Sequence, residues 1–264
     1  MNKQPLLNTY VSNVTMAEAV RGVETLLASG KKSYVVAINV DVVTKIEKDP
    51  YLKEITDNAD MVLVDGTPLV WISKWHKMPV KEKVSGSDLV PQLCATAAQK
   101  GYTLFILGGK DGIAAQAKEK LEQTYPGIRI VGTYAPPLGF EKDEALLAQT
   151  NEIISQAAPD LLIACLGCPK QEKFIYENME KYDARVSVCA GATVDFLAGN
   201  VKRAPRWMRD HGLEWLYRFF QEPKRLFKRY FVDDVKILGL MVKYRNRRKK
   251  KYPPGECTWT VLRS

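Results

Sequence analysis

The sequence predicts an α/β fold, in which helices flank a Rossmann-like, mostly parallel sheet and a basic helical appendage follows at the C-terminus. Three observations predict it. Short runs of almost continuously apolar, β-branched residues recur up to residue 191, as in strands that are buried on both faces. Amphipathic helical segments separate these runs, which is the alternation of βαβ units. From Pro205 onward the alternation stops and only helical patterns remain.

The predicted elements follow one another in a regular order. The first helix is expected at 15–29, before a strand at 33–40 that reads SYVVAINV. Further strands are expected at 60–64, 102–107, 128–133, 160–166 and 185–191, and further helices at 86–100, 111–124, 142–157 and 169–180. The sequence shows no internal repeat and no low-complexity linker, so we predict one α/β domain at 1–200 and a helical appendage at 201–264.

The appendage is basic and amphipathic. Pro223 is expected to start a helix, since proline is tolerated in a first turn. Apolar residues from Leu226 to Val242 recur there at helical spacing, with Lys and Arg between them. The early aromatics, such as Trp207 and Trp215, are expected to pack on the body, and the later ones to form a contact surface.

The charge of the chain is concentrated in this region. Residues 202–251 hold 17 Lys and Arg against 5 Asp and Glu, within totals of 39 and 30 for the chain. The body is therefore near neutral, and the appendage favours a polyanion: nucleic acid, an anionic lipid surface or the phosphates of a substrate. The run RNRRKKK at 245–251 suits nonspecific phosphate binding, but no nucleic-acid-binding motif accompanies it.

The apolar stretches, cysteines and histidines limit where the protein is expected in the cell and which metal or redox sites it can hold. No stretch approaches the roughly 18 apolar residues that a membrane helix needs. Five cysteines, with no predicted signal peptide, favour free thiols in a reducing cytoplasm. Cys165 and Cys168 form a lone C-x-x-C, which is either a redox pair or a strand end followed by a loop thiol. Neither His76 nor His211 is spaced to complete a zinc site.

Polar and glycine residues follow each predicted strand. Ligands of open parallel sheets bind beyond the carboxyl ends of the strands, so these residues are the candidates for a site. In chain order they are Asn39, Asp65, Thr67, Gly108, Gly109, Tyr134, Gly167, Lys170, Gln171 and Asp195. The full nicotinamide-binding glycine fingerprint is absent after the first strand, which argues against an oxidoreductase.

Several of these candidates have more than one interpretation. Gly108 and Gly109 either form a tight turn or let a diphosphate approach the following helix N-terminus. Asp65 is either a helix N-cap or a catalytic base. Lys170 and Gln171 either form an ordinary first turn or meet a phosphate or sugar hydroxyl. Asp88 is expected in the first turn of a helix, as a partner of its dipole.

Six motifs in this order resemble the bacterial WecG/TagA/CpsF family of lipid-linked-sugar transferases, glycosyltransferase family 26. They are VDGTPLV (64–70), KVSGSDL (83–89), LGG (107–109), LGCPKQE (166–172), AGATVDFLAG (190–199) and the block that begins KRAPRWMRDHGLEWLYRFFQEPKR (202–225). The resemblance extends from about residue 10 to residue 245.

The resemblance implies an inverting transfer of a sugar from a UDP-sugar to an undecaprenyl-diphosphate-linked sugar in cell-envelope polysaccharide synthesis. It implies N-acetylmannosamine as the sugar, or alternatively glucose or galactose for capsule or exopolysaccharide. Asp65 matches the proposed catalytic base, Asn39 and Gln171 match pocket positions, and Tyr134 and Asp195 lie on the nucleotide-binding side. Lys83 departs from the usual arginine, which puts bidentate phosphate binding there in doubt.

The remaining expectations concern the diphosphate and the membrane. Because the chain has no Asp-x-Asp pair, we predict metal-independent activity with no cofactor, and Asp233 and Asp234 are interpreted as helix-surface charges. Appendage cations such as Arg206, Arg218 and Arg225 are expected to meet the diphosphate, and the amphipathic appendage to dock on the inner face of the plasma membrane. A homo-oligomer is possible, and no nucleic-acid partner is expected.

Overall fold

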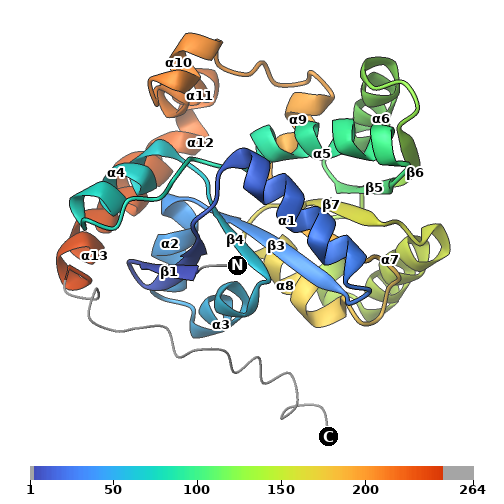
Figure 1. Cartoon of the computed structure of the whole chain (residues 1–264), viewed down its shortest axis with the longest axis horizontal. Coiled ribbons are helices and arrows are strands. Elements are labelled where there is room, and N and C mark those ends of the chain that lie inside the picture. The colour runs from blue at the N-terminus through green and yellow to red at the C-terminus, as the bar shows by residue number, and fades with distance from the viewer. Residues whose placement is uncertain (1–2, 246–264) are drawn as a thin grey trace, which may run out of the picture.

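The structure, a computed structural model, describes residues 3–245, with the side chains of Asp210 and Arg225 excepted. A six-stranded parallel sheet forms its centre, and helices cover both faces (Figure 1). The strand order is β4-β3-β8-β7-β5-β6, so the predicted α/β fold with a parallel sheet is confirmed.

All six predicted strands are present, with ends that shift by a few residues. They are β3 (Ser33–Ile38), β4 (Met61–Val64), β5 (Thr103–Gly108), β6 (Arg129–Tyr134), β7 (Leu161–Cys165) and β8 (Val186–Cys189). Every residue of β4, β7 and β8 is buried, which explains why their sequences are apolar without alternation.

The five helices predicted for the body are also confirmed. They are α1 (Met16–Ala28), α5 (Gly86–Lys100), α6 (Ile113–Thr124), α7 (Glu144–Ala157) and α8 (Lys170–Asn178). A capping box at Thr15 begins α1, where the Thr15 hydroxyl and the Glu18 carboxylate each accept a backbone N–H of the other residue. Helix α6 starts two residues later than expected because Gly112, at φ +75°, occupies its N-cap.

Shorter elements lie between these. An antiparallel hairpin of β1 (Lys3–Leu6) and β2 (Thr9–Ser12) forms a separate small sheet. The other elements of the body are α2 (Val40–Ile46), α3 (Pro50–Asn58), α4 (Thr67–Trp75), η1 (Phe140–Lys142) and α9 (Thr193–Leu197). Each is at most nine residues long, so its sequence carries little helical or strand periodicity.

The two faces of the sheet have separate hydrophobic cores. In β3, Tyr34, Val36 and Ile38 join a core that α2, α3, α7 and α8 cover. Val35, between them, joins a second core beneath α1, α5 and α6. Side chains alternate between faces along a strand, so both faces of β3 contribute to the hydrophobic stabilisation of the fold.

The appendage folds into short helices that pack on the body. They are α10 (Arg206–Asp210), α11 (Glu214–Gln221), α12 (Pro223–Lys228), η2 (Arg229–Asp233), η3 (Asp234–Lys236) and α13 (Ile237–Lys243). The predicted helix start at Pro223 is confirmed. Ile237 and Leu240 are buried in the core shared with α2 and α3, and the Lys243 ammonium lies 2.6 Å from the Glu47 carboxylate. The division of the chain at residue 200 stays a prediction.

The aromatic residues of the appendage differ from expectation. Trp207 is 60% exposed, so it does not pack on the body, and packing on a neighbouring subunit stays a prediction. The buried side chain of α12 is instead the aliphatic Leu226. Phe219 packs against Phe231 with a centroid distance of 5.6 Å, so part of the aromatic surface is held within the appendage. Of the helices within residues 3–245, none combines the length and the apolar character needed to cross a membrane.

Candidate active site

Two adjoining cavities lie beyond the carboxyl ends of β3, β4, β7 and β8. The first cavity has a volume of about 520 Å³ and lies between α4 and the appendage. The second cavity, of about 490 Å³, lies between α2, the start of α8 and the segment after β8. Both volumes are in the range of about 300–1,000 Å³ that is typical of ligand sites. Five residues line both cavities and form a shared wall: Asn39, Asp65, Ser87, Arg218 and Arg229.

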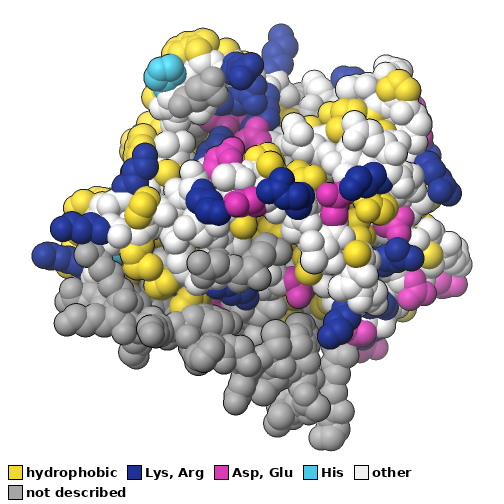
Figure 2. All heavy atoms as spheres, viewed as in Figure 1, with side chains coloured by type: hydrophobic (Ala, Val, Ile, Leu, Met, Phe, Trp, Pro, Cys, Tyr) yellow, Lys and Arg dark blue, Asp and Glu magenta, His cyan; other side chains and the backbone are white. Residues whose placement is uncertain are grey.

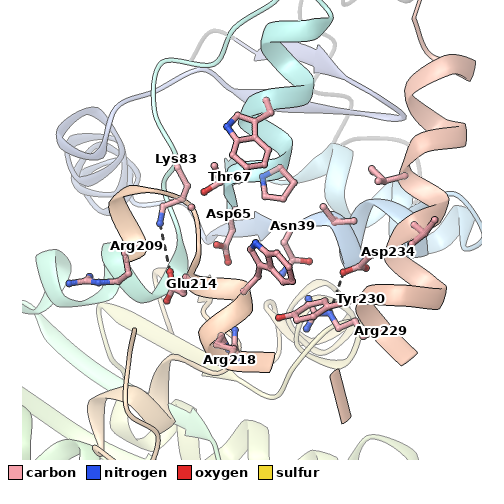
Figure 3. A pocket seen from close by; sticks show the side chains of 18 of the residues that line it. Asn39, Asp65, Thr67, Lys83, Arg209, Glu214, Arg218, Arg229, Tyr230 and Asp234 are labelled. Carbon is pink, nitrogen blue, oxygen red and sulfur yellow. Dashed lines mark ion pairs between the residues drawn. The ribbon is translucent and has the colours of Figure 1, made fainter. Parts of the chain in front are cut away.

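Asp65 holds a central position in the shared wall (Figure 3). It directly follows β4, and its backbone N–H donates a 2.8 Å hydrogen bond to the carbonyl of Ile38 at the end of β3. The N-cap of α4 is Gly66, at φ +115°, and no side chain caps that helix. The N-cap interpretation of Asp65 is therefore wrong, and its carboxylate is available to the cavities.

The surroundings of Asp65 raise its pKa to about 6. Burial is the main cause, because a low-dielectric environment disfavours the charged carboxylate. The positive charge of Lys83 opposes this rise, and the negative charge of Glu214 adds to it. A carboxylate with a pKa nearer neutrality is a better general base than an ordinary aspartate.

Asn39 lies beside Asp65 in the same wall and is the N-cap of α2. Its Oδ1 atom accepts the backbone N–H of Val42 at 3.1 Å. This bond fixes the orientation of the amide and leaves the Nδ2 group as a donor toward the cavities. The predicted pocket position of Asn39 thus has a donor of fixed direction next to the candidate base.

Gln171 and Glu172 form a buried polar pair at the second cavity. The Gln171 amide donates from Nε2 to Glu172 Oε1 at 2.8 Å and accepts the Gly191 N–H at 3.0 Å. Glu172 is fully buried, and burial raises its pKa. Its Oε2 atom has no hydrogen-bond partner within the described residues. Glu172 therefore lines the second cavity with a buried carboxylate oxygen that lacks a hydrogen bond among the described residues.

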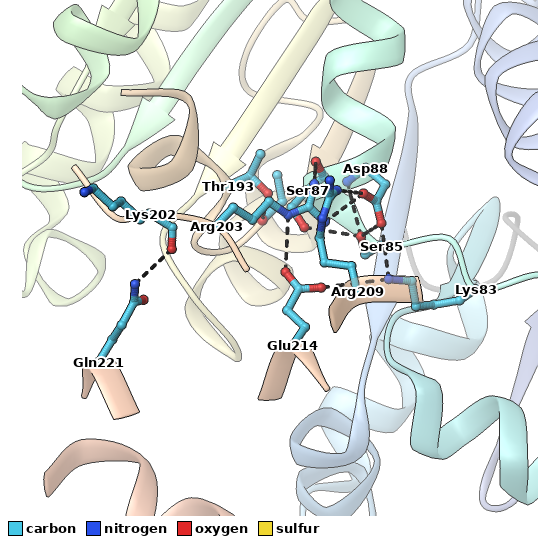
Figure 4. A network of polar contacts seen from close by, with 11 residues as sticks. Lys83, Ser85, Ser87, Asp88, Thr193, Lys202, Arg203, Arg209, Glu214 and Gln221 are labelled. Atoms are coloured by element: carbon cyan, nitrogen blue, oxygen red, sulfur yellow. Dashed lines mark hydrogen bonds and ion pairs between the residues drawn. The ribbon is translucent and has the colours of Figure 1, made fainter. Parts of the chain in front are cut away.

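Lys83 belongs to a charged network that joins the body to the appendage (Figure 4). Its ammonium lies 3.4 Å from Asp88 and 3.9 Å from Glu214. Asp88 is in the first turn of α5, as predicted, and the Ser85 hydroxyl donates to it at 2.6 Å. Burial alone would raise the pKa of Asp88, but the Ser85 bond and the charge of Arg203 lower it below its ordinary value.

Two arginines of the appendage complete the shared wall. Arg218 lies over the ring of Phe196, with 5.4 Å from its guanidinium carbon to the ring centroid. Arg229 lies 3.9 Å from both Asp41 and Asp234, so it is only loosely paired. The Nε atoms of both arginines are buried without a hydrogen-bond partner in the described part of the chain. Such donors suit an anion that enters the cavities.

Asp234 is not the surface charge that its sequence context suggests. Its side chain is 15% exposed and lines the first cavity, and burial raises its pKa to about 6. Asp233, by contrast, is 40% exposed and pairs with Lys236 at 2.7 Å. Among the residues described, no three His, Cys, Asp or Glu side chains are grouped so as to hold a metal ion.

The cavities bring together seven of the predicted site residues. These are Asn39, Asp65, Thr67, Lys83, Gly167, Gln171 and Arg218. Six others line neither cavity: Gly108, Gly109, Tyr134, Lys170, Asp195 and Arg206. The side chain of Arg225 lies outside the described residues.

The sheet order explains part of this division. Gly108, Gly109 and Tyr134 end or follow β5 and β6, which form the far side of the sheet from β4 and β3. A Cβ on Gly108 would lie 2.5 Å from the Cys165 carbonyl oxygen, so this glycine allows close packing of β5 and β7. Lys170 pairs with Glu141 at 2.9 Å, away from both cavities. The substrate-binding roles of these residues remain predictions.

Eight charged residues that line the cavities were not among the predicted site residues: Asp41, Lys45, Glu172, Arg209, Glu214, Arg229, Asp233 and Asp234. A sequence signal was present for Glu172. Glu172, Ile175 and Met179 recur at helical spacing, and the last two are apolar, which places Glu172 on a buried face. Asp41 and Lys45 lie in the short helix α2, and the other five lie in the appendage, where charge alone gives no indication of burial.

Cys165 and Cys168 show no sign of redox activation. Burial raises the pKa of the Cys165 thiol to about 12 and raises that of Cys168 as well. Reactive thiols require the opposite shift, since the thiolate is the nucleophile. The strand-end interpretation of the C-x-x-C pair is therefore favoured, with Cys165 as the last residue of β7.

Comparisons with known proteins identify the family of the chain. The profile of the glycosyl transferase WecG/TagA/CpsF family matches residues 4–251. A protein of Bacillus spizizenii strain W23, named N-acetylglucosaminyldiphosphoundecaprenol N-acetyl-beta-D-mannosaminyltransferase, is 30% identical over 88% of this chain and 87% of its own length. A protein of the same name from Bacillus subtilis strain 168 is 31% identical over 83% of this chain and 82% of its own length.

The family profile covers almost the whole chain, including both cavities and the appendage helices that close them. The chain therefore belongs to the WecG/TagA/CpsF family of glycosyl transferases.

Proposed function

We propose that this protein transfers N-acetylmannosamine from a UDP-sugar to an N-acetylglucosamine that is linked through a diphosphate to undecaprenol, with inversion at the anomeric carbon. The observation that carries the proposal is the position of Asp65, a carboxylate with a raised pKa in the wall shared by two cavities. Two substrates that react with each other need adjoining sites with the base between them. The names of the two Bacillus relatives supply the acceptor and the sugar.

The reaction requires a base, an aligned donor and a stabilised leaving group. A hydroxyl oxygen of the acceptor sugar attacks C1 of the donor sugar and forms the new glycosidic bond, while the bond from C1 to the phosphate oxygen breaks. Asp65 takes the proton of the attacking hydroxyl, and UDP leaves with the electron pair. Asn39, Thr67, Gly167 and Gln171 are suited to hold sugar hydroxyls, because they place donors and acceptors beside Asp65.

Cations that line the first cavity are suited to the leaving diphosphate. Arg218 and Arg229 contribute buried Nε donors, and Lys83 contributes an ammonium from the body. Preorganised charges in a site that excludes water stabilise developing negative charge more strongly than solvent does. Arg206 and Arg225 are proposed as further diphosphate contacts. Gly108, Gly109, Tyr134, Lys170 and Asp195 are proposed for the nucleotide end, with the α6 N-terminus as an anion site.

The acceptor's lipid requires contact with a membrane surface. Lys224 and Lys228 of α12 are exposed, and so is Phe227 between them in sequence. Basic residues near an anionic leaflet each contribute about 1 kcal/mol, and apolar side chains add to this. We propose peripheral binding at the inner face of the plasma membrane.

The membrane proposal is tested by cosedimentation with vesicles that contain phosphatidylglycerol. The double variant Lys224→Glu, Lys228→Glu is expected to lose binding, and Lys31→Glu, in an exposed loop before β3, serves as the control. Equal binding by the double variant and by the wild type would contradict the proposal.

The transfer itself is tested by turnover. The purified protein is incubated with GlcNAc-diphosphate-lipid and, separately, UDP-ManNAc, UDP-GlcNAc, UDP-glucose and UDP-galactose. Product is expected with UDP-ManNAc, and the alternative capsule activity predicts UDP-glucose or UDP-galactose instead. Absence of product with every donor, together with salt-sensitive RNA binding, would favour the nucleic-acid interpretation. The motif on which that interpretation rests, RNRRKKK, lies outside the described residues except for Arg245.

A further inference from the structure

Exposed apolar side chains line part of the first cavity, and this part is called its apolar end. Trp71 of α4 and Leu238 of α13 line this end, and their side chains are 56% and 60% exposed. Phe231 and Val235 line it from the appendage, with 51% and 49% exposure. Large apolar side chains that gather at the mouth of a cavity indicate an apolar ligand or partner.

Charged side chains line the rest of the same cavity. They are Asp65, Lys83, Arg209, Glu214, Arg218, Arg229 and Asp234. The cations of this set, together with the exposed apolar side chains, fit a ligand with an anionic head and a hydrocarbon tail. A protein partner would cover the apolar end but would leave the cations inside the cavity, including the Arg218 and Arg229 Nε atoms that lack a hydrogen bond among the described residues, without an anion.

We propose that the apolar end of the first cavity is an isoprenoid subsite, which holds the prenyl units next to the diphosphate of the acceptor. This inference rests on the proposed function. It adds the place where the acceptor's lipid lies on the protein. Methyl-branched prenyl units pack well on flat aromatic faces, which Trp71 from the body and Phe231 from the appendage provide. The chain then exits past exposed Leu238 toward the lipid.

The surface around this mouth suits a bilayer. Lys74 and Lys77, at and just after the end of α4, are exposed close to Trp71 in sequence. Figure 2 shows Lys and Arg side chains among hydrophobic ones at the left of the view, where Figure 1 places α4 and α13. The subsite therefore opens on a surface that anionic headgroups and acyl chains can both contact.

The subsite is tested by acceptor selectivity in solution, without vesicles. Two water-soluble acceptors are compared, GlcNAc-diphosphate-farnesyl and GlcNAc-diphosphate-methyl, by their kcat/KM with a saturating UDP-sugar. The wild type is expected to prefer the farnesyl acceptor. In Trp71→Ala this preference falls at least about tenfold, which corresponds to about 1.4 kcal/mol of lost selective binding.

The control variant is Trp207→Ala. Trp207 is 60% exposed, as Trp71 is at 56%, but it does not line the first cavity. Its variant should keep the wild-type preference. A second variant of the subsite, Leu238→Asp, should reproduce the loss, because a charge at an exposed position changes the ligand contact without creating a core cavity.

Three results would overturn the inference. The first is an unchanged preference in Trp71→Ala and Leu238→Asp. The second is an equal loss in Trp207→Ala, which indicates general adhesion of exposed tryptophans. The third is a change in the sedimentation mass of Trp71→Ala, which indicates an interface between copies of the chain. If no acceptor reacts, the proposed function fails, and calorimetric binding of farnesyl diphosphate to the same variants decides the subsite by itself.

Discussion

The Nη2 atom of Arg203 lies 2.7 Å from the Oδ1 atom of Asp88. The two side chains are only 20% and 24% exposed, and the pair joins the first residues of the appendage to the start of α5. Arg203 also donates from Nη1 to the Ser87 carbonyl at 3.1 Å and from Nε to Glu214 at 3.2 Å. This arginine therefore ties the appendage to the wall of the active site.

Removal of Arg203 is expected to destabilise the protein. Arg203→Ala leaves Asp88 and Glu214 partly buried without their main cation, and loss of one partner of a buried pair costs about 3 kcal/mol. Urea denaturation should show this loss, and Asp88→Asn in the same background should add little. Lys118→Ala breaks an exposed pair on α6 and is expected to cost less than about 0.5 kcal/mol. An equal effect of both variants would contradict the role of Arg203.

The pH dependence of activity should report Asp65. Below a pKa of about 6 its carboxyl is protonated and unable to accept the acceptor's proton, so kcat/KM should fall tenfold per pH unit on the acid side. Lys83→Met removes a positive charge that lowers this pKa, and should therefore shift the acid limb to higher pH. Asp65→Asn should reduce kcat by at least about 100-fold and retain UDP binding. Near-normal turnover in Asp65→Asn would refute the assignment.

Asp65 is also expected to cost stability at neutral pH. Its pKa is raised on folding, so the folded protein holds a proton that the unfolded chain releases between about pH 4 and 6. The contribution of Asp65 to the free energy of unfolding therefore falls as pH rises through that window, by on the order of 3 kcal/mol at most. Asp65→Asn should raise the urea midpoint at pH 7.5 but have little effect near pH 4. The control is Asp111→Asn, at an exposed position. A rise of the urea midpoint in Asp65→Asn that is equal at both pH values would contradict the interpretation.

Gly108 is expected to be required for folding. An alanine there must adopt φ +105°, and its Cβ would lie 2.5 Å from the Cys165 carbonyl oxygen. Gly108→Ala should therefore cost more than about 2 kcal/mol, since the neighbouring strand has to move. Gly112 has φ +75°, but a Cβ added there would have no atom within 4 Å. Gly112→Ala should therefore cost only the backbone penalty of about 1 kcal/mol. Thermal unfolding of both variants separates the packing effect from the backbone effect.

Activity is expected to be independent of divalent metal ions. The chain has no Asp-x-Asp pair, and Arg218, Arg229 and Lys83 provide positive charge for the diphosphate. Transfer rates should be the same in buffer, in excess EDTA and in EDTA followed by Mg²⁺ or Mn²⁺. Loss of activity in EDTA and its return with metal would contradict this prediction.

Much of the fold could be predicted because the central strands are buried on both faces. Continuous apolar runs such as DLLIACL have few other interpretations, and the helices between them are long enough to show a period. The strand order could not be predicted, since the apolar run of β5 does not reveal that β7, not β4, is its neighbour. The β1–β2 hairpin was missed because its strands, KQPL and TYVS, mix polar and apolar residues and the first contains a proline, whereas β4 and β8, of equal length, are apolar runs.

The site could be predicted where it depends on strand ends. Asn39 and Asp65 follow strands directly, and Gly167 follows β7 after one residue, so the fold class alone places them at one edge of the sheet. Arg229 and Asp234 could not be assigned in this way, because their positions depend on how the appendage packs against α2. Basic composition indicated an anionic partner but not which cations enter the cavities.

The wall between the two cavities has a consequence for how ligands affect one another. Arg218 and Arg229 line both cavities and come from the appendage, so a molecule bound in either one contacts the same two side chains. If binding in one cavity shifts these arginines and so changes the affinity of the other, thermodynamic reciprocity requires the two effects to be equal. A bisubstrate inhibitor that spans Asp65 would gain from this coupling as well as from its own two halves.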